Sequence, residues 1–245
     1  MSSNGRLPVL CTLCGRQPVG AVEVSLHGEL TCAHHGVSGR CVLCGRAGDA
    51  DPAPGWRPIL GSRLRCPTCA AGAVETQADA RRYLPSVRRE MTSIGIRLDT
   101  PVRVEVVDGR EFHPAAVAGE GILLGVTEQR RTPGQRWVEV ARIQIIRGLT
   151  PTHFGRTVAH ELGHAWLAQR GVTAAAPMVE EGVCELFAHA WLKRQGSALA
   201  AAMRAHLRDN PDPVYGGGFR AVHGSVVRHG IDAVLHDVAR TGRIP

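Results

Sequence analysis

The chain has 245 residues and a formal net charge of +7. This length allows one sizeable hydrophobic core together with a small additional module. The sequence has no apolar run after a basic start and no stretch of about eighteen apolar residues, so we expect neither a signal peptide nor a membrane span, and we expect a soluble protein of the cytoplasm.

The basic residues argue against a nucleic-acid partner. They number 29, they include a single lysine, Lys193, and the arginines are spread along the chain without a dense run. A nucleic-acid-binding face would concentrate these charges, and its affinity would fall steeply with salt. We interpret the arginine excess as a GC-rich coding bias and expect no nucleic-acid partner.

Seven of the eight cysteines precede residue 70 and form four short knuckles in series, three of the type Cys-x-x-Cys and one Cys-x-x-His. Each knuckle presents half of a tetrahedron, so four knuckles predict two structural zinc sites, with the first knuckle paired to the second and the third to the fourth. The predicted ligands are Cys11, Cys14, Cys32 and His35 in one site and Cys41, Cys44, Cys66 and Cys69 in the other.

Other readings of these cysteines stay open at this point. The two sites could be interleaved rather than sequential, and His34 could replace His35. Disulfides are disfavoured because an intracellular chain keeps its thiols reduced and because a histidine completes the second knuckle. Cys184 stands apart from the knuckles and is expected to be a small, buried apolar residue.

The region between the knuckles and residue 150 predicts a helix and a small sheet. Residues 73–94 have a helical pattern in which Pro85 predicts a kink or a break into two short helices. Residues 102–107, 121–126 and 137–146 have strand patterns separated by turn residues. One edge strand of such a sheet could hold an extended substrate by main-chain hydrogen bonds, or the sheet could only cover the helical core.

The most informative segment is Val158-Ala-His-Glu-Leu-Gly-His-Ala-Trp166. Thr150 and Pro151 predict the start of a helix, and Gly171 predicts its end. On this helix His160 and His164 share one face and can bind one zinc ion, with Glu161 beside the metal. The opposite face is expected to pack into the core through Phe154, Val158, Leu162, Ala165 and Trp166.

A catalytic zinc needs a third protein ligand, and a second helix, 178–192, offers Glu181, Glu185 and His189 on one face. A His-Glu-x-x-His helix followed by a helix that starts with Glu-Glu-Gly resembles the gluzincin peptidases. That resemblance implies Glu181 as the third ligand, with Glu180 as the alternative. Glu185 is suited to hold a ligand imidazole in its metal-binding tautomer, and His189 is expected to be structural.

The segments His-Glu-Leu-Gly-His-Ala-Trp-Leu from His160 and Val-Glu-Glu-Gly-Val-Cys-Glu-Leu from Val179 resemble the DA-one family, the plant LIM-domain peptidases. Stretches around residues 32–44, 64–69, 215–220 and 241–245 extend the resemblance to nearly the whole chain, and the coding bias suggests a bacterial member. The resemblance implies a zinc endopeptidase with ligands His160, His164 and Glu181 and with Glu161 as the base. At Glu185 the family more often has an uncharged residue.

We therefore expect an α+β protein: a LIM-like two-zinc module at 1–71, a helical connector at 72–98, and a compact gluzincin-like peptidase domain at 99–245 with a small antiparallel sheet. The predicted cofactors are one catalytic and two structural Zn²⁺ ions. The partners are a protein or peptide substrate and a protein bound by the LIM-like module. Tyr215, in an expected glycine-rich loop, would stabilise the oxyanion, with His223 in reserve. The alternative is a non-enzymatic zinc adaptor.

Overall fold

A computed structural model describes residues 10–36, 39–48, 54–112, 123–130 and 138–245. The chain divides into two compact units, Met1–Gly72 and Ala73–Pro245. The helix that we expected to connect two domains belongs to the second unit. Within the described ranges, the helices are all too short or too polar to cross a membrane.

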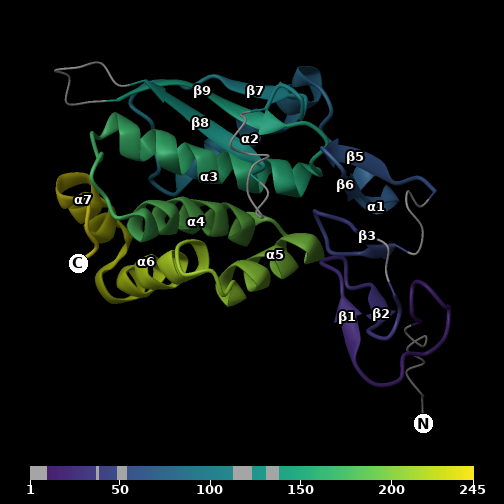
Figure 1. Cartoon of the computed structure of the whole chain (residues 1–245). Coiled ribbons are helices and arrows are strands. Elements are labelled where there is room, and N and C mark those ends of the chain that lie inside the picture. The colour runs from purple at the N-terminus through teal and green to yellow at the C-terminus, as the bar shows by residue number, and fades with distance from the viewer. Residues whose placement is uncertain (1–9, 37–38, 49–53, 113–122, 131–137) are drawn as a thin grey trace, which may run out of the picture. The chain divides into compact units, whose positions relative to one another are not determined.

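The described part of the first unit contains three short antiparallel hairpins and one turn of helix (Figure 1). β1 (Val22–Val24) pairs with β2 (Leu30–Cys32), β3 (Gly39–Arg40) with β4 (Ala47–Gly48), and β5 (Arg57–Leu60) with β6 (Arg63–Arg65), followed by α1 (Pro67–Ala70). Few large apolar side chains are available to hold such short strands together. Six of its cysteines are buried, but the only large apolar side chains buried among its described residues are Leu43, Ile59 and Leu60, so its stability depends on what the cysteines bind.

Two of the knuckles have the same backbone turn. The N–H of Cys11 donates to the carbonyl of Arg16, and the N–H of Cys41 donates to that of Arg46, both at 2.8 Å. In each knuckle the turn closes at a glycine with positive φ, 66° at Gly15 and 77° at Gly45. Glycine adopts this conformation without strain. The chain therefore reverses directly after the second cysteine of each knuckle, and both sulfurs of that knuckle are directed to the same side.

The second unit contains a three-stranded sheet in the order β7-β9-β8. Its strands are β7 (Val104–Val107), β8 (Gly125–Arg130) and β9 (Glu139–Ile146). β8 runs antiparallel to β9, but β7 runs parallel to it, so the predicted all-antiparallel sheet is wrong. An alternating pattern predicts a strand but not its partner or direction.

The position of β8 also differs from the prediction. We expected a strand at 121–126 from its apolar residues, of which 121 and 122 lie outside the described residues. The observed strand runs on through Thr127, Glu128 and Gln129 to Arg130. Polar residues are tolerated here because β8 is at an edge of the sheet formed by the described strands and lines a cavity rather than the core.

Six helices complete the described part of the second unit. They are α2 (Gln77–Ser93), α3 (Pro151–Gln169), α4 (Pro177–Arg194), α5 (Ala198–Asp209), α6 (Tyr215–His229) and α7 (Ile231–Thr241). α2 is one helix, so Pro85 does not break it. A capping box between Thr76 and Asp79 and the burial of Ala80, Val87 and Met91 outweigh the lost backbone hydrogen bond.

α3 is the central helix of this unit and follows the sequence prediction. Thr150 caps it by accepting a hydrogen bond from the N–H of His153, Pro151 occupies its first turn, and Gly171 beyond its end has a φ of 69°. α3 packs between the sheet and α4, and α6 packs on α4 (Figure 1). The apolar face predicted from the sequence is buried, and a buried Val, Leu or Phe side chain contributes about 1.5–3 kcal/mol.

α4 and α6 approach each other through glycines. A Cβ added at Gly182 would lie 2.5 Å from the carbonyl oxygen of Gly218, so only glycine permits this spacing. The run Tyr215-Gly-Gly-Gly is therefore the first turn of α6 and not the loop that we expected. Asp212 starts this helix by accepting hydrogen bonds from the N–H groups of Val214 and Tyr215, both at 2.8 Å.

Candidate metal centres

Each half of the first unit brings four potential ligands together. The sulfurs of Cys11, Cys14 and Cys32 lie with a ring nitrogen of His35 within 4.8 Å of one another. The sulfurs of the second set, Cys41, Cys44, Cys66 and Cys69, do the same. These are the two sequential groups predicted from the sequence, with His35 rather than His34, and all eight cysteines of the chain are free thiols.

The donor sets of both groups fit a metal ion. Nε2 of His35 is buried and has no hydrogen-bond partner among the described residues. Sγ of Cys11 accepts N–H groups from Leu13 and Cys32 at 3.4 and 3.5 Å, which stabilises a thiolate. Nε2 of His27 lies 3.3 Å from Sγ of Cys69, a contact that the knuckle spacing does not predict.

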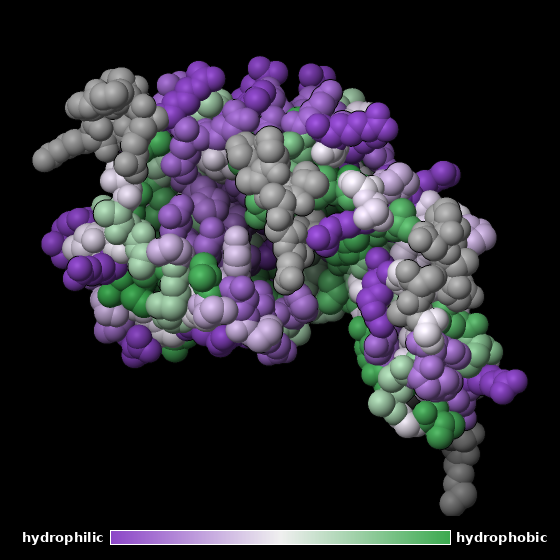
Figure 2. All heavy atoms as spheres, viewed as in Figure 1, coloured by the Kyte–Doolittle hydropathy of each residue, from purple (hydrophilic) through white to green (hydrophobic). Residues whose placement is uncertain are grey.

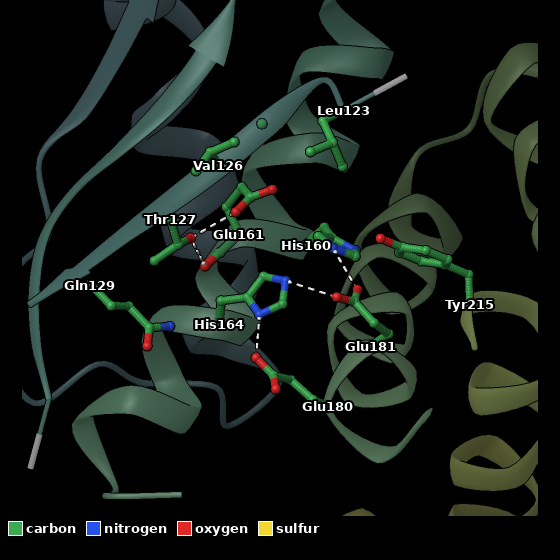
Figure 3. A pocket seen from close by; sticks show the side chains of 11 residues that line it. Leu123, Val126, Thr127, Gln129, His160, Glu161, His164, Glu180, Glu181 and Tyr215 are labelled. Atoms are coloured by element: carbon green, nitrogen blue, oxygen red, sulfur yellow. Dashed lines mark hydrogen bonds and ion pairs between the residues drawn. The ribbon is translucent and has the colours of Figure 1, made fainter. Parts of the chain in front are cut away.

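In the second unit, α3 and α4 direct two histidines toward one carboxylate (Figure 3). Nε2 of His160 lies 3.3 Å from Oε2 of Glu181, and Nε2 of His164 lies 3.7 Å from Oε1 of the same residue. The two imidazole rings are 5.2 Å apart between centroids. The Nε2 atoms of the two histidines and the Glu181 carboxylate thus lie around one position, which suits a shared metal ion.

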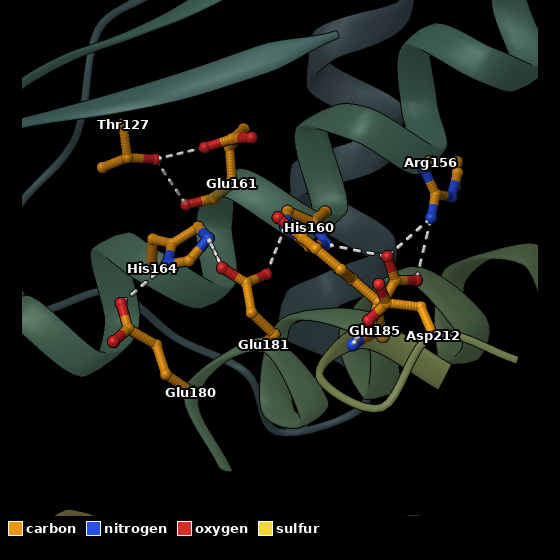
Figure 4. A network of polar contacts seen from close by, with 10 residues as sticks. Thr127, Arg156, His160, Glu161, His164, Glu180, Glu181, Glu185 and Asp212 are labelled. Carbon is orange, nitrogen blue, oxygen red and sulfur yellow. Dashed lines mark hydrogen bonds and ion pairs between the residues drawn. The ribbon is translucent and has the colours of Figure 1, made fainter. Parts of the chain in front are cut away.

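Two further carboxylates face the Nδ1 atoms of the two imidazoles, one for each histidine (Figure 4). Nδ1 of His160 lies 3.4 Å from Oε1 of Glu185, and Nδ1 of His164 lies 3.1 Å from Oε1 of Glu180. Glu180 and Glu185 therefore occupy equivalent places behind the two histidines, while Glu181 lies between them. This geometry favours Glu181 over Glu180 as the carboxylate of a shared metal.

The electrostatics of this centre favour a cation. Oε2 of Glu181 and Nδ1 of His160 are buried without a hydrogen-bond partner of proper geometry in the described part of the chain, although each has an oppositely charged group nearby. Burial alone would lower the pKa of His160, but Glu181 and Glu185 outweigh it and raise that pKa to about 10. A positive charge is thus stabilised where Nε2 meets Glu181, and the donor set of two nitrogens and a carboxylate is one that zinc binds.

Glu161 is held beside the histidines by β8. The hydroxyl of Thr127 lies 2.7 Å from Oε2 of Glu161 and 3.1 Å from its main-chain oxygen. A Cβ on Gly125 would lie 2.8 Å from Oε1 of Glu161, so glycine at this point leaves room for the carboxylate. The side chain of Glu161 is buried yet borders the cavity, as a proton acceptor for a bound reactant requires.

These residues line one cavity of ≈310 Å³ between β8, α3, α4 and the start of α6. Hydrophilic residues gather in this hollow on the face shown in Figure 2. Tyr215 closes one side, with its ring stacked on that of His160 at 6.5 Å between centroids. Burial and then the charges of Glu181 and Glu185 raise the pKa of Tyr215 to about 12, so its hydroxyl stays a donor.

Three further predictions concern residues around this cavity. Cys184 is fully buried as expected, but its sulfur also lies within 4.8 Å of ring nitrogens of His160 and His164. His189 packs against Phe219 and His223, in keeping with a structural role. His223, our reserve for the oxyanion, contacts His189 and is not among the residues that line the cavity.

Sequence reasoning missed three contributors to the centre: Gly125, Thr127 and Arg156. The first two stand on β8, whose register relative to α3 is set by tertiary packing. Arg156 precedes His160 by one helical turn, and it contacts both oxygens of Glu185 at 2.6 and 2.9 Å. Its spacing on α3 was a usable signal, because residues four apart on a helix share a face.

Two histidines four apart on one helix, a glutamate next to the first, and a glutamate from a second helix define a possible catalytic metal centre of the His-Glu-x-x-His class. A family model described as "DA1-like: Protein DA1" matches residues 79–207, just over half of the chain. The chain belongs to the DA1-like family, a family of peptidases, as its sequence resemblance implied.

Curated relatives come from Arabidopsis thaliana. The chain is 28% identical to Protein DA1 over 202 residues and 28% identical to Protein DA1-related 1 over 204 residues, covering 71% of this chain and 36% and 35% of those proteins. It is 23% identical to Protein DA1-related 2 over 296 residues, covering 92% of this chain and 56% of that protein. The chain thus spans between about a third and just over half of these relatives. No solved structure matches it.

Proposed function

We propose that the protein is a zinc-dependent endopeptidase whose centre is formed by His160, His164 and Glu181. The observation that carries the proposal is the position of the Glu181 carboxylate, 3.3 and 3.7 Å from the Nε2 atoms of the two histidines, in the same cavity as Glu161. Membership of a peptidase family supports the same reaction. Three protein ligands leave a coordination position open for water or substrate.

Each cavity residue then has a definable task. A zinc ion bound by His160, His164 and Glu181 would polarise the scissile carbonyl and lower the pKa of a water molecule. Glu161 accepts the proton of the attacking water and passes it to the leaving amine. Thr127 donates to Oε2 of Glu161 and so fixes the carboxylate for both transfers.

Tyr215 is the proposed donor to the oxyanion that forms during attack. Its hydroxyl points toward His160 and the cavity (Figure 3). With a pKa of about 12 the phenol keeps its proton at neutral pH. A donor that is fixed before the reaction stabilises the developing negative charge without reorganisation.

β8 provides a place for an extended polypeptide. The outer edge of β7 is occupied by the side chain of Gln77, which donates to the carbonyl of Val104 and accepts from the N–H of Val106 at 3.0 and 2.9 Å. β8 pairs with β9 on one side, borders the metal centre, and has a second hollow of ≈370 Å³ along it. A substrate strand added at this edge would pass the cavity, which favours protein substrates over small molecules.

The first unit would hold two structural zinc ions, one in each group of four ligands. We propose that this module recognises the substrate or a protein partner, or gates the peptidase. Because its ligands fill a tetrahedron in each group, no position remains for chemistry. A non-enzymatic zinc adaptor would contain the same two closed sites but would not cleave a substrate.

Cleavage of casein or of a peptide library, measured with and without a zinc chelator, tests the function. We expect cleavage that the chelator abolishes and that added zinc restores. The His160→Ala protein is the matched control, because it keeps the first unit but loses a ligand of the second. Chelator-resistant cleavage, or equal cleavage by His160→Ala, would overturn the proposed mechanism.

A further inference from the structure

Arg156 and Glu185 form a partly buried ion pair directly behind the candidate metal centre (Figure 4). Nη2 of Arg156, on α3, contacts Oε1 and Oε2 of Glu185, on α4, at 2.6 and 2.9 Å. The Glu185 side chain is only 6% exposed, and that of Arg156 is 26% exposed. This pair lies outside the set of three proposed ligands and the base.

The Glu185 carboxylate has a second neighbour. Its Oε1 atom, which Arg156 contacts at 2.6 Å, also lies 3.4 Å from Nδ1 of His160. One carboxylate oxygen thus connects the guanidinium to the imidazole. Nδ1 faces this oxygen at 3.4 Å without the geometry of a full hydrogen bond. The carboxylate stabilises a proton on Nδ1, and that proton leaves the lone pair of His160 on Nε2, the nitrogen that faces Glu181.

A carboxylate at this depth needs both a countercharge and a fixed rotamer. Burying an unpaired charge is strongly unfavourable, and a glutamate side chain has several rotamers that would remove it from His160. Arg156 provides the countercharge from the same helix as His160, one turn earlier. The distance between imidazole and carboxylate is therefore set jointly by α3 and α4.

We propose that Arg156 is a positioning residue of the metal centre: through Glu185 it fixes the orientation in which His160 presents Nε2 to the metal. The inference deepens the proposed function, because it takes zinc as the ion bound by His160. A different role would be a helix-to-helix ion pair that only stabilises the packing of α3 on α4. The two roles differ in whether the affinity for zinc changes when the Arg156–Glu185 ion pair is removed.

A double-mutant cycle on zinc affinity separates these roles. The full chain is prepared as wild type, Arg156→Met, Glu185→Gln and the double variant, and the zinc dissociation constant of the second unit is measured by competition with a chelating dye. His160→Ala supplies the baseline for zinc held by the cysteines. Arg147→Met, which removes a 2.6 Å ion pair with Asp108 on the sheet, is the matched control.

We expect each single variant to weaken zinc binding by roughly 10- to 100-fold, as is typical for residues that orient a metal ligand. The double variant should be no weaker than the worse single variant, because both changes interrupt the same connection. Arg156→Lys should recover part of the affinity, since lysine keeps the charge but offers a single point of contact. The Arg147→Met control should bind zinc as the wild type does.

Unchanged zinc affinity in Arg156→Met and Glu185→Gln, or additive losses in the double variant, would overturn the proposal. If Arg156→Met does not fold, the comparison of Arg156→Lys with Glu185→Gln decides, because neither leaves an uncompensated carboxylate. A wild-type protein that binds the third zinc but cleaves no substrate would refute the peptidase function and leave this inference standing. A wild type that binds zinc only at the cysteines would refute both.

Discussion

The two units of this protein gather potential metal ligands in different ways. In the first unit each group has four ligands, and seven of the eight are cysteines that lie on short turns close together in sequence. In the second unit two histidines and a glutamate come from two long helices, and the group borders a cavity. A closed set of four ligands can only hold structure, whereas an open set of three leaves a position for chemistry.

The surroundings of the two kinds of group differ as well. In the first unit backbone N–H groups donate to the sulfur of Cys11, and the cysteines lie on or beside small hairpins. In the second unit, carboxylates and Arg156 stand behind the histidines, and Thr127 holds Glu161. We therefore expect removal of a ligand to unfold the first unit, and removal of a cavity residue to change the reaction while the fold of the second unit is kept.

The largest effect is expected for Cys41→Ser. Zinc binding contributes about 10–16 kcal/mol to the folding of small zinc modules, more than the net stability of a typical domain. We expect the first unit to lose a zinc ion and to become sensitive to limited proteolysis, while the second unit keeps its zinc. Elemental analysis and mass spectrometry of the fragments measure both results.

Cys184→Ala is the control for the loss of a buried cysteine. It should retain three zinc ions and leave the first unit resistant to proteolysis. Loss of the third zinc ion in this variant would indicate that Cys184, in place of Glu181, is a ligand of the metal centre in the second unit. If the Cys41→Ser protein kept the zinc content of the wild type, the distinction between the four-ligand sites of the first unit and the three-ligand centre of the second unit would be wrong.

Glu161→Gln tests the other half of the comparison, the centre in the second unit. The amide is nearly isosteric and cannot accept the proton, so turnover should fall by about 10²- to 10⁴-fold. Zinc content and thermal stability should stay close to those of the wild type, because the proposed ligands remain. Glu139→Gln, an exposed position on β9, is the control. Wild-type turnover in Glu161→Gln would show that another group is the base.

Tyr215→Phe should have the next largest effect. Loss of one oxyanion donor typically reduces kcat by about 10²- to 10³-fold, and the effect should fall on kcat rather than on KM. Tyr83→Phe on α2 is the matched control, since the chain has two tyrosines. Kinetics on one peptide substrate would measure both. A change confined to KM would instead indicate that Tyr215 contacts the bound substrate.

Sequence predicts well what depends on local spacing. The knuckles bring their ligands together because each pair closes within one turn, and α3 has its histidines on one face because helical periodicity requires it. The third ligand was assigned to Glu181, with Glu180 as the alternative, from the resemblance to the gluzincin peptidases. Choosing between them needs the rotation of α4 against α3, which the Gly182–Gly218 contact with α6 helps to set.

What sequence did not predict depends on pairing between distant segments. The strand pattern gave no direction for β7 and placed β8 too early, because polar residues of an edge strand are indistinguishable from those of a loop. Gly125 and Thr127 acquire a role only when β8 lies over Glu161. The glycine run at the start of α6 was taken for a loop because glycine is unfavourable within helices, and here close packing on α4 overrides that preference.

Thr127 offers the finest test of the open centre, because its only expected effect is on the position of a proton acceptor. A hydrogen bond to a charged group is worth about 1.5–3 kcal/mol, so Thr127→Val should lower turnover by roughly 10- to 100-fold. Thr127→Ser keeps the hydroxyl that lies 2.7 Å from Oε2 of Glu161 and should retain most of the activity. Zinc content should be the same in both, since neither change touches His160, His164 or Glu181. If Thr127→Val kept wild-type turnover and Thr127→Ser lost it, the methyl group rather than the hydroxyl would matter, and Thr127 would serve only to pack β8 against α3.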